Sequence, residues 1–192
     1  MATLLISEHD NQSLNPATLS AITAARQIGG DLTVLIAGSG CQAVADDVAG
    51  IAGVSRVLLA DNPAYAKGLA ENLSLLVREL ASDYSHVIAP ATTTSKDFMP
   101  RMAALLDVGQ LSEIISVESP DTFKRPIYAG NAIATVRSVD AIKVITVRTS
   151  AFDKAEASGG SASIEVLAQV CDSGTSDFVS EEMVTSERPD LT

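Results

Sequence analysis

Short apolar runs alternate with segments of helical periodicity through the first half of the chain. The runs are rich in Leu, Ile and Val, and they fall at residues 3–8, 32–37, 56–60 and 86–89. Between them, apolar residues recur every three or four positions, as a helix with one buried face requires. Strands that alternate with helices are typical of βαβ units, so this pattern predicts an α/β fold around a parallel sheet.

Capping residues and apolar stripes define the first three predicted helices. Asn15 is a favourable N-cap, Pro16 suits the first helical position, and the glycines at 29–30 end this helix. A second helix is predicted at about 41–52, where valine and isoleucine recur on one face. The third follows a stripe of leucines at 69–80.

The rhythm of the sequence changes after the fourth predicted helix. We expect this helix to begin at Asp97 as its N-cap, to carry Pro100 in its first turn and to end at Gly109. Four further strands then follow without helices between them, at residues 111–117, 123–128, 132–136 and 142–148. Turn residues separate these strands, so the sheet is predicted to end in antiparallel strands.

The composition becomes polar after Phe152. Residues 153–192 are rich in Ser, Gly, Asp and Glu, with an extended segment expected at 164–170. Such a sequence cannot bury a core of its own, so it stays mobile or lies over another surface. The sequence therefore predicts one doubly wound, mostly parallel α/β domain with added antiparallel strands at residues 1–152, followed by an extended arm at 153–192.

Charge and cysteine content narrow the choice of partners and compartment. Thirteen Lys and Arg against 24 Asp and Glu give a net charge of -11, which disfavours nucleic acid and anionic membranes as partners. Cys41 and Cys171 lie outside any metal or redox spacing, which favours a reducing compartment. We see no signal-peptide pattern and no apolar run near the roughly 18–20 residues that span a bilayer. These features predict a soluble, cytoplasmic protein without membrane insertion.

A glycine-rich turn is the strongest nucleotide-binding pattern in the sequence. Gly38 and Gly40 begin a G-x-G-x-x-A motif that ends at Ala43, between a predicted strand and a predicted helix. The amides there would hold a pyrophosphate, and Asp61 near the end of the next strand would accept the ribose hydroxyls. The motif follows the second strand, however, and Gly-Ser-Gly is also a good tight connection between a strand and a helix.

A hydroxyl-rich turn at residues 92–96 is the second candidate. Thr93 and Ser95 lie in it, where the carboxyl end of a strand meets a helix, and Lys96 follows. Hydroxyls, a lysine and a helix dipole could bind an anion at this edge of the sheet. Hydroxyl side chains are equally common as helix caps.

The remaining motifs do not indicate catalysis. Residues 158–163, Ser-Gly-Gly-Ser-Ala-Ser, resemble the phosphate loop of ATP pyrophosphatases but lack its Asp and follow the last strand, so a flexible or partner-bound loop is expected. His9 and His86 are the only histidines, and neither lies in a hydrolase or metal motif. Aromatic residues make up 4% of the chain and Trp is absent, so there is no stacking platform for a flavin ring. We expect no catalytic residue, no metal ligand and no independent flavin site.

Several segments together resemble the alpha subunit of electron transfer flavoproteins. They lie at residues 4–9, 14–19, 100–104, 119–132, 147–152, 158–163 and 188–192. The most specific is the run SPDTFKRPIYAGNA at 119–132. The resemblance covers the whole chain and implies a fold similar to that of the adenine nucleotide alpha hydrolases. It also implies that the chain stops just before the FAD-binding domain, which residues 188–192 would precede as a linker.

The resemblance implies a role in electron transport. The full-length subunit would form a heterodimer with a beta subunit, bind FAD largely in its C-terminal domain, and relay electrons from acyl-CoA and other dehydrogenases of fatty acid beta-oxidation to a membrane quinone oxidoreductase. No FAD residue has a position here, so this chain would be a non-catalytic scaffold and heterodimerisation domain without FAD of its own. Because the beta subunit's related domain holds AMP in typical members, Gly38, Gly40, Thr93 and Ser95 would form a vestigial version of that site.

Two other hypotheses remain open. In the first, the chain is a nucleotide-binding enzyme that uses residues 38–43 and 92–96 around one cleft, with His9 as an acid or base. In the second, it is an independent signalling or stress protein of similar fold. The linker-like ending at 188–192 argues against the second hypothesis.

Overall fold

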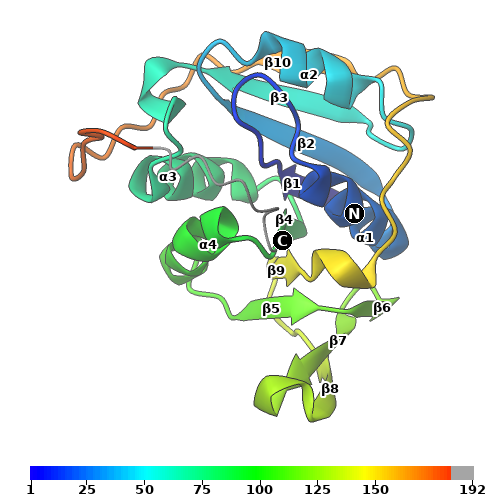
Figure 1. The fold of residues 1–192 in the computed structure, drawn as a ribbon. Coiled ribbons are helices and arrows are strands. Elements are labelled where there is room, and N and C mark those ends of the chain that lie inside the picture. The colour runs from blue at the N-terminus through cyan, green and yellow to red at the C-terminus, as the bar shows by residue number, and fades with distance from the viewer. Residues whose placement is uncertain (183–192) are drawn as a thin grey trace.

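A seven-stranded, wholly parallel sheet forms the centre of the computed structural model, which describes residues 1–182 (Figure 1). Its spatial order is β10-β3-β2-β1-β4-β9-β5. The strands are β1 (Ala2–Ile6), β2 (Asp31–Gly38), β3 (Arg56–Asp61), β4 (His86–Pro90), β5 (Gln110–Ile114), β9 (Lys143–Val147) and β10 (Ser163–Val166). The chain steps outward from β1 in one direction and then returns to the other side of β1, which confirms the predicted doubly wound α/β fold.

Helices cover both faces of this sheet. They are α1 (Pro16–Ile28), α2 (Gln42–Ala49), α3 (Ala70–Ala81) and α4 (Thr93–Leu105). The apolar residues of α1 and α2 belong to one core cluster, and those of α3 and α4 belong to another. Leu5 of β1 points into the first cluster, whereas Leu4 and Ile6 point into the second. Burial on both faces explains why the central strands are almost continuously apolar.

The ends of α1 follow the predicted capping pattern, but the start of α4 does not. Asn15 Oδ1 accepts a hydrogen bond from the Ala17 amide at 2.9 Å, as expected. The prediction of Asp97 as the N-cap of the fourth helix is wrong, because Thr92 caps it and the helix begins at Thr93. Pro100 therefore lies in the helix interior, on its exposed side, and not in the first turn. Gly109 lies beyond the last helical residue, Leu105.

The antiparallel strands form a sheet of their own. Strands β6 (Ser116–Ser119), β7 (Thr122–Ile127) and β8 (Ala132–Arg137) pair in that order, so the prediction that the main sheet ends in antiparallel strands needs correction. Strand β9 instead returns to the main sheet and pairs in parallel between β4 and β5. Its side chains Val144, Ile145 and Val147 are all fully buried, which only a strand covered on both faces can achieve.

The predicted strand at 111–117 is split between the two sheets. Glu113 has a positive φ of 54°, and the register of β5 shifts between Leu111 and Ile114. After this irregularity the Ile115 amide bonds to the Lys124 carbonyl at 2.8 Å, so the chain leaves β9 and joins β7.

The arm lies along the surface of its own domain. Strand β10 extends the main sheet by pairing with β3, and it covers only the start of the segment predicted at 164–170. Figure 1 shows the arm, coloured from yellow to orange, passing the end of α2 and the edge of β3 towards α3. The linker-like residues 188–192 lie outside the described residues.

Candidate functional site

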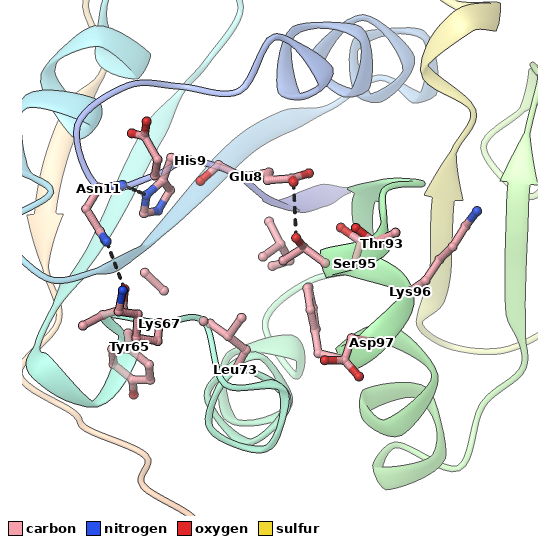
Figure 2. Close-up of a pocket in the computed structure, with 18 of the residues that line it drawn as sticks. Glu8, His9, Asn11, Tyr65, Lys67, Leu73, Thr93, Ser95, Lys96 and Asp97 are labelled. Carbon is pink, nitrogen blue, oxygen red and sulfur yellow. Dashed lines mark hydrogen bonds between the residues drawn. The ribbon is translucent and has the colours of Figure 1, made fainter. Parts of the chain in front are cut away.

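A cavity of about 840 Å³ opens at the carboxyl end of the parallel sheet. The loop that follows β1, the segment at 65–68 and the first turn of α4 line it (Figure 2). This is the point where the sheet order reverses between β1 and β4. Open α/β sheets place their ligands at such switch points, so this cavity is the candidate functional site.

The structure brings one of the two predicted loops to the cavity. Thr93 and Ser95 line it, with Ser95 buried and Thr93 exposed. Gly38 and Gly40 are not among the lining residues. Ala37 of β2, which directly precedes that turn, does line the cavity.

The chain supplies its own carboxylate at the start of α4. Glu8 Oε1 accepts a hydrogen bond from the Thr94 hydroxyl at 3.2 Å, drawn as a dashed line in Figure 2. Glu8 Oε2 is buried and has no hydrogen-bond partner among the described residues. A carboxylate beside the first turn of a helix is stabilised by the unpaired amides and the dipole there. Glu8 therefore places a carboxylate of the chain itself beside the first turn of α4.

The amides of the glycine turn are also occupied by the chain itself. The Ser39 amide donates to Asn11 Oδ1 at 3.0 Å, and the Gly40 amide donates to Asp61 Oδ1 at 2.7 Å. A side chain at Gly38 would overlap Asn11 Oδ1, so glycine is needed here for close packing of the β1 loop. Asp61, predicted to accept ribose hydroxyls, instead bonds to the turn.

His9 belongs to a loop that is closed by hydrogen bonds. Its Nδ1 accepts the Asn11 amide at 3.1 Å, and burial lowers the pKa of His9 below 6.5 despite the nearby Asp10. The imidazole is therefore neutral near pH 7. Asp10 closes the loop by accepting the amides of Gln12 and Ser13, which lowers the pKa of its carboxyl. These contacts hold His9 in place without a catalytic partner among the described residues.

The arm reaches the mouth of the cavity. Lys67 lines the cavity, forms an ion pair with Glu181 of the arm, and lies 4.5 Å above the Phe178 ring. The buried Tyr65 hydroxyl accepts the Cys171 amide at 2.7 Å. Sequence reasoning did not single out Glu8, Asn11, Tyr65 or Lys67. Their position is the one signal in the sequence that could indicate a site, because Glu8 and Asn11 follow an apolar strand closely.

The glycine-rich segment 158–163 attaches the arm to the end of α2. The Gly160 amide donates to the Gly50 carbonyl at 2.8 Å, and the Ala162 amide donates to the Ala49 carbonyl at 2.9 Å. Gly159 and Ile51 form an antiparallel bridge. The loop is therefore bound to the end of α2 in the same chain. The sequence predicted a flexible or a partner-bound loop, and the contacts with α2 do not fit a flexible one.

His86 lies away from the cavity and links the two sheets. Its Nε2 lies 2.6 Å from the Pro120 carbonyl, and its Nδ1 lies 2.9 Å from the Ser85 hydroxyl.

Residues 1–182 hold no group of three or more His, Cys, Asp or Glu side chains arranged for a metal ion. Cys41 and Cys171 are both free thiols, and burial raises the pKa of Cys41 to about 11. In the same part of the chain, no helix is long and apolar enough to cross a membrane.

Comparison with known proteins gives one consistent result. The model of the electron transfer flavoprotein domain family matches residues 3–170. Over 192 residues, the chain is 59% identical to an electron transfer flavoprotein subunit alpha from Pseudomonas aeruginosa and 57% identical to one from Bradyrhizobium diazoefficiens. A third, from Paracoccus denitrificans, is 49% identical over 193 residues. All of this chain is matched in each case, and it spans 62%, 61% and 62% of these relatives, respectively.

Proposed function

Because the chain belongs to the electron transfer flavoprotein family, as an alpha-subunit sequence, we propose that it is a scaffold and heterodimerisation domain that pairs with a beta subunit. The observation that carries this proposal is the state of the switch-point cavity. Glu8 lies at the start of α4, and Asn11 and Asp61 hold the amides of the glycine turn. A domain whose own side chains already contact both candidate loops is suited to a structural role.

The redox chemistry in this proposal belongs to the complete subunit. In it, the full-length protein binds FAD outside the present chain and carries electrons from acyl-CoA and other dehydrogenases to a quinone oxidoreductase of the respiratory chain. The names of the relatives support flavin involvement, and their greater length leaves room for a further domain. We place the protein in the cytoplasm, as its bacterial relatives suggest, and assign no catalytic residue to the chain.

We also propose a division of the chain into a domain and an arm. We assign residues 1–152 to the α/β domain and 153–192 to an arm that leads towards a flavin domain. The hydrogen bonds of Gly160, Cys171 and Ser173 to the domain surface support an arm that is guided along a fixed path.

Absorption spectroscopy and native mass spectrometry of the purified chain, alone and with the beta subunit, test the proposal. We expect no flavin absorption band, no bound cofactor mass and co-elution with the beta subunit. A flavin or nucleotide that stays with the chain alone would contradict the scaffold role.

A nucleotide-binding role is the second candidate, and the size and position of the cavity favour it. In this role Thr93 and Ser95 would contact the phosphate and Glu8 would have to move aside. A ligand that binds only the folded state raises the melting temperature. A shift with AMP or ATP that is lost in Ser95→Ala would support this candidate against the scaffold.

A further inference from the structure

We propose that residues 174–181 of the arm are a flap that opens and closes over the mouth of the switch-point cavity. Figure 1 shows this segment as the orange to red loop beside α3. Its residue Glu181 lines the cavity together with Lys67, so the flap forms part of the cavity wall. A solute that enters at this wall has to pass the flap, and the position of the flap therefore controls access to the cavity.

The arm is firmly attached just before the flap. The Cys171 amide donates to the Tyr65 hydroxyl at 2.7 Å, and the Ser173 amide donates to Asn72 Oδ1 at 2.8 Å. Tyr65 and Asn72 are both buried, so breaking these bonds would leave buried polar atoms without a partner, which is costly. This anchor, residues 171–173, therefore stays bound when the flap moves.

The flap itself is held by exposed and half-buried side chains. Glu181 forms an ion pair with Lys67, and these side chains are 56% and 41% exposed. Lys67 Nζ also lies 4.5 Å from the centroid of the Phe178 ring, and the Ser176 hydroxyl donates to Glu71 at 2.8 Å. Exposed ion pairs and cation–π contacts each contribute little, and salt screens the ion pairs. These contacts can therefore break and re-form while the anchor holds.

A glycine separates the anchor from the flap. Gly174 has a positive φ of 62°, and its amide donates to Asp172 Oδ1 at 3.1 Å. A Cβ atom there would meet no other atom within 4 Å, so close packing does not require a glycine at this position. Glycine instead provides backbone freedom, which a pivot needs. The flap can turn at Gly174 while Cys171 and Ser173 remain bound.

Thiol labelling of the cavity wall tests the flap in the purified chain. Ser95 is buried and lines the cavity, so Ser95→Cys in a Cys171→Ser background places a thiol inside it. The remaining Cys41 is buried with a pKa raised to about 11, and it reacts slowly. We expect Lys67→Gln and Glu181→Gln each to raise the rate of maleimide labelling about fivefold, because each removes the ion pair that holds the flap.

Two controls separate flap opening from other effects. Glu182→Gln removes the same charge one position further on and leaves the pair with Lys67 intact, so the labelling rate should not change. Ser20→Cys places a thiol in α1, at a buried position that does not line the cavity, and its labelling reports opening of the whole domain. Lys67→Gln and Glu181→Gln should leave the rate at this second thiol unchanged.

Three results would overturn the proposal. Equal rates at Ser95→Cys with and without the ion pair would mean that the flap does not limit access. Equal acceleration at Ser20→Cys would mean that the variants loosen the whole domain. Opposite changes in Lys67→Gln and Glu181→Gln would show a direct effect of charge on the thiol, because these variants remove opposite charges.

Tryptophan fluorescence gives a second test that remains decisive if Ser95→Cys does not fold. The chain contains no Trp, so Phe178→Trp introduces a single fluorophore into the flap and keeps an aromatic ring beside Lys67. We expect its anisotropy to fall when sodium chloride is added and when Lys67→Gln is introduced. An anisotropy that neither change lowers would contradict an opening flap. All of these measurements use the chain alone, so their failure would leave the heterodimer proposed above untouched.

Discussion

Gly160 is a position where the absence of a side chain holds two segments together. A Cβ atom there would overlap the carbonyl of Ile51, so only glycine lets the arm approach the end of α2. We predict that Gly160→Ala lowers the free energy of unfolding by about 1–3 kcal/mol, the usual cost of forcing extra volume into a packed contact. Urea denaturation measures the loss, and limited proteolysis should show faster cleavage of the arm.

Gly109→Ala is a suitable control for this prediction. Its added Cβ would lie 3.4 Å from Asp140, which is an ordinary contact, and the site is far from the arm. Equal stability losses in the two variants would mean that the arm does not depend on the close approach at Gly160.

His86 makes the stability of the domain sensitive to mild acid. Burial outweighs the hydrogen bond to Pro120 and lowers the pKa of His86 below 6.5. The unfolded state then binds more protons than the folded state below about pH 6.5, so the free energy of unfolding falls as the pH drops through that range. We predict a flatter dependence between pH 7.5 and 5.5 for His86→Gln than for the unaltered chain, measured by urea denaturation at each pH.

His9 contributes to the same dependence, because burial also lowers its pKa. His9→Gln should therefore remove another part of the slope, and the double variant should show the flattest curve. An unchanged slope in His86→Gln would show that its folded and unfolded pKa values are alike.

At the scale of elements, a proline in its interior weakens helix α4. Pro100 is exposed in the interior of α4 and cannot donate to the carbonyl four residues earlier. We predict that Pro100→Ala raises the free energy of unfolding by about 1–3 kcal/mol, up to the full difference in helix propensity. Thermal melts followed by circular dichroism would record it. A lower melting temperature would show that the surrounding structure is built around the proline.

Elements with local signals could be predicted from the sequence, and those fixed by distant contacts could not. The cap at Asn15 is local, and the structure confirms it. The sequence does not locate the start of α4, because Thr92 and Asp97 are both acceptable caps; in the structure Thr92 caps the helix, and Ser95 and Phe98 are buried within it. The place of β9 depends on β4 and β5, which lie far away in the sequence.

In the candidate site, too, local features could be predicted from the sequence and contacts between distant segments could not. The hydroxyl-rich turn at Thr93 and Ser95 was predicted at a sheet edge, and the structure places it in the cavity wall. The internal partners of the two loops, Glu8 and Asn11, come from the loop after β1. No spacing rule connects that loop with residues 28 or 86 positions later, so only the fold reveals these contacts.

At the scale of the whole molecule, the arm completes the main sheet. Strand β10 covers the edge of β3, and Ile164 packs against the apolar core. We predict that a chain ending at residue 157 is less stable and self-associates, because its β3 edge is open for pairing. Sedimentation velocity over a concentration series measures association. A chain ending at 182, which keeps β10, should remain at the size of the unaltered chain, and equal behaviour of both truncations would contradict the prediction.

The late position of β10 also has a consequence for synthesis. Glu165 of β10 bonds to Arg56 of β3 across 109 positions of sequence. At a translation rate of about 5–20 residues per second, the edge of β3 stays uncovered for on the order of 5 to 20 s after its own synthesis. During this interval the nascent chain exposes an unpaired strand edge to other proteins near the ribosome. Slow codons between β3 and β10 would lengthen the exposure. A chaperone that binds strand edges would reduce the risk of aggregation during it.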